Sequence, residues 1–76
     1  MRPDDIHEFT RRRPFLPYRI YTTDGHSYDI RHPDQLIVLR SRVIIGVGSE
    51  NGVPDHAEHV ALIHIVRLEE LETAST

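Results

Sequence analysis

The chain has 76 residues, no cysteine and a formal net charge of −3. This length allows one domain with a thin core, and the lack of cysteine excludes disulfides and thiolate metal sites as sources of stability. The slight acidity argues against a surface built wholly for nucleic acid. We therefore expect tight packing or self-association to stabilise the fold.

The charge is unevenly distributed. Residues 1–48 contain eight Arg against six acidic residues, a net of +2, whereas residues 49–76 contain one Arg against six, a net of −5. The longest mostly apolar stretch, residues 36–47, is interrupted by Arg40 and Arg42 and is too short to span a bilayer. The acidic start does not read as a signal peptide. We expect a cytoplasmic protein with no membrane contact.

The first predicted element is a short helix over residues 4–13. Asp4 is a suitable N-cap, acidic side chains fill the first turn, and three Arg residues complement the helix dipole at the C-terminal end. Pro14 and Pro17 cannot continue a helix because they lack the backbone donor and fix φ. The chain is therefore expected to become extended here.

Two strands are predicted around an Asp-Gly turn. Residues 18–23 and 26–31 alternate apolar and polar side chains, as a half-buried strand does. Asp24-Gly25 lies between them, and this dipeptide is favoured in two-residue hairpin turns because their central positions need positive φ. The sequence therefore predicts a hairpin.

Three further strands are predicted downstream. Residues 36–40 are a short apolar run, residues 43–48 follow after a tight connection, and residues 59–68 are rich in Val and Ile. A helix over residues 55–71 is the alternative for the last segment. Residues 72–76 are predicted to form a flexible tail.

Together these elements predict one small, mainly β domain over residues 1–71, with a short N-terminal helix followed by about five antiparallel strands in a small open barrel. The strands at 36–40 and 43–48 are apolar on both faces, so something must cover the second face. We expect a homo-oligomer formed through strand edges and this second face. The residues assigned to the interface are Leu36, Val38, Val43, Ile45 and Val47.

Four segments resemble a family of short uncharacterised bacterial proteins: PFLPYRI at 14–20, TDG at 23–25, HPD at 32–34 and IHIVRLE at 63–69. The resemblance covers nearly the whole chain, but the family has no settled activity, so it implies a relationship and not a function. The order of elements is also similar to the Sm-like fold, a small SH3/Sm-type barrel whose members form rings and bind RNA. The second strand departs from the Sm motif, because Tyr-Asp-Ile-Arg at 28–31 lacks its glycine and Asp34 comes too early.

Basic and aromatic residues form a candidate nucleic-acid surface, since Arg binds phosphate and Tyr stacks on bases. Its members are Arg11, Arg12, Arg13, Tyr21, Tyr28, Arg31, Arg40 and Arg42. The alternative interpretation is structural: the Arg residues complement the helix and pair with acidic side chains, and the Tyr residues are half-buried in strands.

A candidate metal site consists of Asp55, His56 and His59, with Glu58 and His64 nearby. Imidazole and carboxylate are common metal ligands, but on a strand His56 and His59 point apart, and the spacing matches no strong metal signature. Solvated loop histidines are the alternative.

No catalytic pattern is recognisable: the chain lacks a nucleophile motif and a phosphate-binding loop, so we expect neither an enzyme nor a cofactor. The leading hypothesis is a small non-catalytic binding or assembly module that self-associates and whose partner is unknown. The alternative hypotheses are RNA or single-stranded nucleic-acid binding and metal binding.

Overall fold

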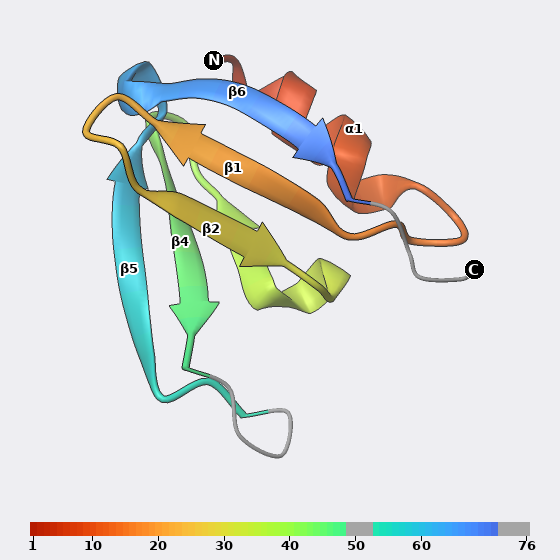
Figure 1. Ribbon diagram of the computed structural model, residues 1–76. Coiled ribbons are helices and arrows are strands. Elements are labelled where there is room, and N and C mark those ends of the chain that lie inside the picture. The colour runs from red at the N-terminus through yellow and green to blue at the C-terminus, as the bar shows by residue number, and fades with distance from the viewer. Residues whose placement is uncertain (49–52, 72–76) are drawn as a thin grey trace.

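The computed structural model describes residues 1–48 and 53–71, which contain one helix and six strands (Figure 1). The elements are α1 (Pro3–Arg11), β1 (Tyr18–Thr22), β2 (Ser27–Ile30), η1 (Pro33–Gln35), β3 (Leu36–Val38), β4 (Arg42–Val47), β5 (His56–Ala61), η2 (Leu62–His64) and β6 (Ile65–Glu70). The prediction of a mainly β fold with a short N-terminal helix is confirmed. The predicted tail at 72–76 lies outside the described residues. Within them, no helix is long and apolar enough to cross a membrane.

The strands form two antiparallel sheets of three strands each. The first sheet has the order β2-β1-β6 and the second has the order β3-β4-β5. The described strands therefore form two sheets and not the single small open barrel that was predicted. The 3-10 turns η1 and η2 explain the difference, because each interrupts the chain where it passes from one sheet to the other. Pro33 in η1 has no backbone N–H and cannot continue a ladder.

The predicted strand over residues 59–68 is in fact two strands separated by η2. Leu62 and Ile65 are both buried, at 4% and 3% exposure. These residues are three apart, and the three residues per turn of a 3-10 helix place them on the same side. A continuous strand would have pointed them to opposite faces. Burial of both side chains therefore favours the turn, and the alternative helix over residues 55–71 is excluded.

Helix α1 begins one residue earlier and ends two residues earlier than predicted. Pro3 is its first residue, so Asp4 lies inside the first turn instead of at the N-cap. The carboxylate of Asp5 accepts a hydrogen bond from the backbone N–H of Arg2 at 3.2 Å. At the other end, Arg12 is already extended (ψ 141°). The approach to Pro14 disfavours helical geometry for the residues before it.

The Asp24-Gly25 hairpin is confirmed, with a loop of three residues where two were expected. The backbone N–H of Thr22 donates to the carbonyl of His26 at 3.0 Å, and that of Gly25 donates to the carbonyl of Thr22 at 3.1 Å. Gly25 has φ 88°, in the left-handed region that favours glycine. This is the usual three-residue hairpin, a turn followed by a left-handed glycine.

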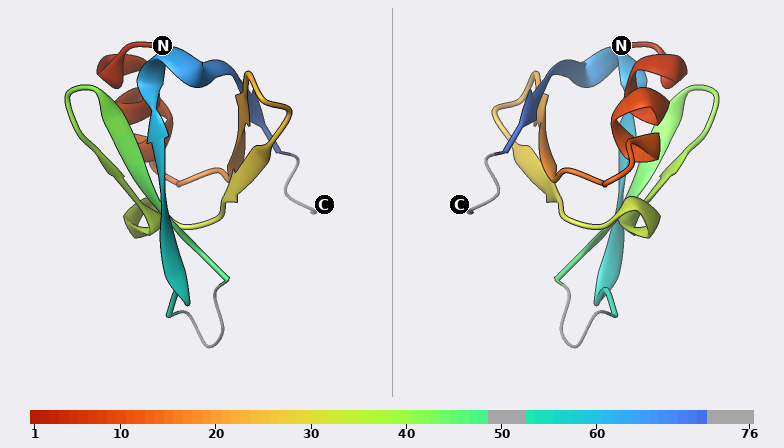
Figure 2. Two further views of the ribbon diagram at one scale, coloured as in Figure 1. Left: turned by 90° about the vertical axis from the view of Figure 1, so that its left-hand side faces the viewer. Right: turned by 90° about the vertical axis from the view of Figure 1, so that its right-hand side faces the viewer.

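The core lies between the two sheets, and α1 packs beside it. Figure 2 shows α1 between the β3–β4 hairpin and β6. Ile6 is fully buried, and the Phe9 ring centroid lies 5.2 Å from that of Tyr18 in β1. The hydroxyl of Thr10 donates to the carbonyl of Ile6, so the buried Tyr18 hydroxyl donates in turn to Thr10 Oγ1 at 2.9 Å. The helix therefore faces the core with its apolar side.

Gln35 in η1 joins the two sheets. Its side-chain amide donates to the carbonyl of Asp29 in β2 at 3.0 Å and to that of Gly46 in β4 at 2.9 Å. Its Oε1 accepts a hydrogen bond from the backbone N–H of Arg31 at 2.8 Å. One side chain thus satisfies three backbone groups that the break between β2 and β3 leaves without ladder partners.

Candidate functional site

The side chains predicted for an interface point into the core of the second sheet. Leu36, Val43 and Ile45 are buried, and Val38 and Val47 are partly buried and pack against the core. The antiparallel register pairs Leu36 with Ile45 and Val38 with Val43, so all five residues share the inner face. The predicted assignment is therefore wrong about the face, because these residues already serve the fold of the single chain.

The alternate residues of the same strands form an apolar outer face. Ile37 pairs with Ile44 across β3 and β4, and the backbone N–H of Leu39 donates to the carbonyl of Arg42 at 2.8 Å. Ile37 is 57% exposed and Leu39 is 40% exposed, whereas Ile44 is partly buried. We call Ile37, Leu39 and Ile44 the outer apolar strip. The expectation that these strands are apolar on both faces is thus correct.

The surroundings of the strip are small or weakly polar. Across β4 and β5, Ile44 pairs with His59 and Arg42 pairs with Ala61. Further along, Gly46 pairs with Ala57, and a Cβ on Gly46 would lie 2.7 Å from the side chain of Pro54. Proline therefore packs closely on this end of the outer face. The result is a weakly polar surface with one charged residue, Arg42, at its edge.

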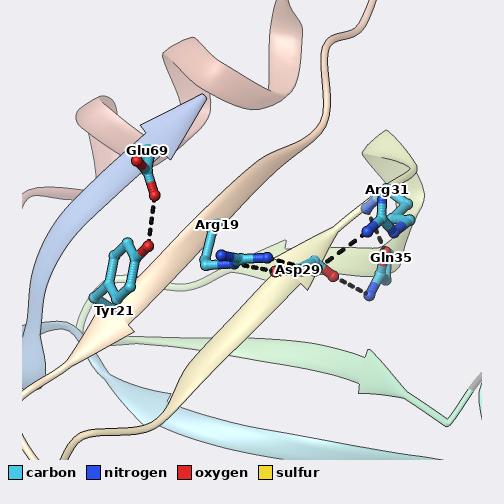
Figure 3. A network of polar contacts seen from close by, with 6 residues as sticks. All are labelled: Arg19, Tyr21, Asp29, Arg31, Gln35 and Glu69. Atoms are coloured by element: carbon cyan, nitrogen blue, oxygen red, sulfur yellow. Dashed lines mark hydrogen bonds and ion pairs between the residues drawn. The ribbon is translucent and has the colours of Figure 1, made fainter. Parts of the chain in front are cut away.

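The outer face of the first sheet is polar and its charges are paired with each other (Figure 3). Nε of Arg19 lies 2.6 Å from Oδ1 of Asp29, and Arg31 lies 3.3 Å from the same carboxylate. The hydrogen bond from Arg19 is the main cause that lowers the pKa of Asp29. The hydroxyl of Tyr21 donates to Glu69 at 2.5 Å. These groups neutralise one another across the strands, which is typical of a solvated face.

The two tyrosines of the candidate nucleic-acid set lie on opposite faces of the first sheet. The register pairs Ile20 with Tyr28, so Tyr28 shares the inner side of buried Ile20. Tyr21 lies on the outer side with Arg19. The structure therefore does not bring the two rings together as a stacking platform.

The arginines of that set are also divided between distant places. Arg12 lies 2.9 Å from Glu70 at the C-terminal end of β6, and its guanidinium is 4.4 Å from the Phe9 ring centroid. The turn that contains Arg40 and Arg42 lies at the other end of β6, because Leu62 of η2 donates to the carbonyl of Ser41. Six strand residues separate these ends by roughly 17–20 Å.

The remaining two arginines lie at the C-terminal end of the helix. Arg11 is its last residue and is exposed, whereas Arg13 Nη1 donates to the backbone carbonyls of Thr10 and Arg12 at 3.3 and 2.8 Å. Arg13 thus caps the end of α1, as the structural interpretation expects.

The residues of the candidate metal site do not converge. His56 and His59 lie on opposite faces of β5, three positions apart on a strand. His56 contacts carboxylates on both sides, with Asp55 at 3.7 Å and Glu58 at 3.3 Å. Among the described residues, no group of three or more His, Cys, Asp or Glu side chains is arranged to hold a metal ion.

A pocket of about 600 Å³ lies between β5 and the β1–β2 hairpin. Its lining residues are Thr22, Thr23, Asp24, His26, Tyr28, Glu58, His59, Val60, Ala61 and His64. Asp24 accepts hydrogen bonds from the Thr22 hydroxyl and from the backbone N–H of His26, and these bonds lower its pKa. Burial raises the pKa of Tyr28, and the negative charges of Glu58 and Asp24 raise it further. The lining therefore contains two carboxylates, those of Asp24 and Glu58, together with three histidines and neither Arg nor Lys.

Sequence reasoning missed both this pocket and the role of Gln35. The residues of the pocket come from segments about 35 positions apart, and none of them forms a recognisable motif. Gln35 follows a His-Pro-Asp turn, which signals a break in the chain but not which carbonyls the next side chain reaches. Comparison of the chain with protein-family models, with curated proteins and with solved structures finds no match.

Proposed function

We propose that the protein is a small non-catalytic assembly module that self-associates through the outer apolar strip. The observation that carries this proposal is the exposure of Ile37 and Leu39 beside Ile44 on one sheet face. In the described residues, α1 packs towards the core with Ile6 and leaves this face to solvent. A second copy is the occupant we propose, because the strip is apolar and self-complementary under a two-fold axis.

The cost of disrupting the strip follows from its exposure. Burial of a whole Ile side chain stabilises by about 1.5–3 kcal/mol, and 57% of Ile37 is still available for burial. Each copy of a two-fold dimer therefore gains about 1 kcal/mol or more at this side chain. Replacement by Asp removes that gain twice, so Ile37→Asp weakens a dimer by at least about 2 kcal/mol, or roughly 30-fold.

Val66 provides a matched control. It is 60% exposed, close to the value for Ile37, but it belongs to β6 in the other sheet. Sedimentation equilibrium between micromolar and millimolar protein measures the association directly. We expect the wild-type chain and Val66→Asp to associate equally and Ile37→Asp to associate roughly 30-fold or more weakly. A wild-type chain that stays monomeric throughout, or equal effects of the two substitutions, would refute the proposal.

A further inference from the structure

Strand β5 forms an edge of the second sheet. The order β3-β4-β5 leaves one side of β5 without a neighbour among residues 1–48 and 53–71. Edge strands are usually blunted by proline, lysine, a bulge or an inward-pointing charge, and of these β5 carries only the inward-pointing Glu58. Between His56 and Ala61 there is no proline or lysine, and the register with β4 is unbroken over all six residues. The edge is therefore suited to pairing with another extended chain.

The backbone groups on this free side can be identified from the register. In an antiparallel pair, opposite residues alternate between hydrogen-bonded and non-hydrogen-bonded positions. Leu62 donates its backbone N–H to the carbonyl of Ser41, and Arg42 lies opposite Ala61. The positions that bond to β4 are therefore His56, Glu58 and Val60. The N–H and C=O groups of His59 and the N–H of Ala61 point away from β4, whereas the carbonyl of Ala61 belongs to the first turn of η2.

The pocket lies along this free edge. Four consecutive residues of β5, from Glu58 to Ala61, form one wall, and residues of the β1–β2 hairpin form the other. Both views of Figure 2 show β5 between the β3–β4 hairpin and the β1–β2 hairpin. The hairpin is fixed in this position because the backbone N–H of Thr23 donates to the carbonyl of His64 at 2.8 Å. The free peptide groups of β5 thus face a groove.

The charge of the groove selects the partner's side chains. Glu58 is on the inner face of β5 with Val60, on the same side as Tyr28. The negative charges of Glu58 and Asp24 both raise the pKa of Tyr28, so both carboxylates act on the same hydroxyl. The lining contains neither Arg nor Lys. A cationic side chain placed here would meet the carboxylate of Glu58 and the ring of Tyr28. It would share the carboxylate of Asp24 with His26, whose Nδ1 lies 3.0 Å from it.

We propose that β5 and this groove bind an extended, basic segment of a partner protein by strand addition. The partner strand pairs with the free N–H and C=O groups of His59 and with the free N–H of Ala61, which gives affinity. Its alternate side chains point towards Tyr28, Asp24 and Glu58, so Arg or Lys at these positions gives specificity. The five edge residues from Ala57 to Ala61 span roughly 17 Å and match a partner strand of about five residues.

The probe is a synthetic heptapeptide, acetyl-Thr-Arg-Val-Arg-Val-Arg-Thr-amide, titrated into isotope-labelled protein and followed by the backbone amide NMR signals. We expect shifts confined to β5 and the β1–β2 hairpin, and weaker binding as salt is raised. The same peptide with Glu in place of Arg is expected not to bind. A second control carries N-methyl groups on alternate residues. One N-methyl phase is expected to abolish binding, and the opposite phase to leave it intact, because only one edge of the peptide pairs with β5.

Two substitutions in the protein test the two parts of the site. Ala61 has φ −68°, which proline adopts without strain, and its N–H is not used by β4. We expect Ala61→Pro to weaken binding about tenfold by removal of one backbone hydrogen bond, and Ala61→Ser to leave it unchanged. Glu58→Gln is expected to weaken the basic peptide about two- to fivefold.

Several results would overturn the proposal: equal binding of the acidic peptide, insensitivity to the phase of N-methylation, or shifts that lie outside β5 and the hairpin. A groove already filled by a second copy would show as β5 shifts that depend on protein concentration alone, without peptide binding, and would also overturn it. Ile37→Asp is expected to leave peptide binding unchanged. Failure of this site and failure of self-association are therefore separate outcomes.

Discussion

Replacement of Gln35 by Ala tests how the two sheets are held together. The substitution removes one donor from each of the partly buried carbonyls of Asp29 and Gly46, and the acceptor from the backbone N–H of Arg31. Each lost hydrogen bond costs about 1 kcal/mol, so we expect a loss of about 2–3 kcal/mol in the free energy of unfolding. A domain of this size has only about 4–11 kcal/mol in total. The melting temperature should fall by roughly 8–24 °C.

The assay is urea unfolding followed by circular dichroism, with the thermal midpoint as a second readout. Gln35→Glu is the matched variant, since it preserves the acceptor for Arg31 but loses both donors and directs a carboxylate at two carbonyls. At neutral pH it should be at least as destabilising as Ala. Its deficit should shrink at low pH, where protonation restores one donor. A loss below about 0.5 kcal/mol in Gln35→Ala would show that the side chain does not join the sheets.

Four further predictions concern single residues. Thr10→Val should cost about 1–2 kcal/mol in urea unfolding because the buried Tyr18 hydroxyl loses its acceptor. Burial raises the pKa of Tyr18, so the native state favours the neutral phenol. The contribution of this group to the free energy of unfolding should be fully present below about pH 10 and be lost as pH rises above it. Tyr18→Phe should remove this pH dependence. Gly25→Ala should cost about 1–2 kcal/mol in thermal unfolding, because φ is 88° there. Arg19→Gln should raise the pKa of Asp29 towards its ordinary value, measured by carboxyl NMR.

The sign of the last effect also fixes a pH dependence. Because the folded pKa of Asp29 is lowered, its contribution to stability is present above the unfolded pKa of about 3.9 and is lost as pH falls through the folded value. Arg19→Gln should flatten this acid limb. Unchanged Asp29 titration in the variant, an unaltered alkaline slope in Tyr18→Phe, or wild-type stability in Thr10→Val or Gly25→Ala would each contradict the corresponding contact.

Local chemistry was enough to predict the first hairpin. Asp24 and Gly25 determine a turn by themselves, and the alternating strands on either side need no information from the rest of the chain. The last strand needed such information. The segment that contains Leu62 and Ile65 can be interpreted as one continuous strand or as two strands joined by a 3-10 turn. Only the burial of both side chains against the core selects the 3-10 turn.

The faces of the second sheet could not be assigned from β3 and β4 alone, because both strands carry apolar side chains on both faces. Val60 in β5 provides the missing information. It is the only large apolar side chain of β5, between His59 and Ala61, so it is the residue of that strand expected to point into the core. Through the register, Val60 fixes Val43 on the inner face and Ile37 on the outer one. That register depends on the connection through residues 48–55, whose length does not determine pairing.

Self-association through the outer apolar strip is tested most directly by isotope-filtered NOE spectroscopy on a mixture of labelled and unlabelled chains. The Ile37 and Leu39 methyl groups are exposed in the single chain and absent from the core. The account predicts NOEs between these methyl groups of one copy and those of another, at concentrations where the sedimented mass exceeds that of the 8.8 kDa chain. Intermolecular NOEs that instead involve Val66 or Ile63, or none at all in an associated sample, would contradict it.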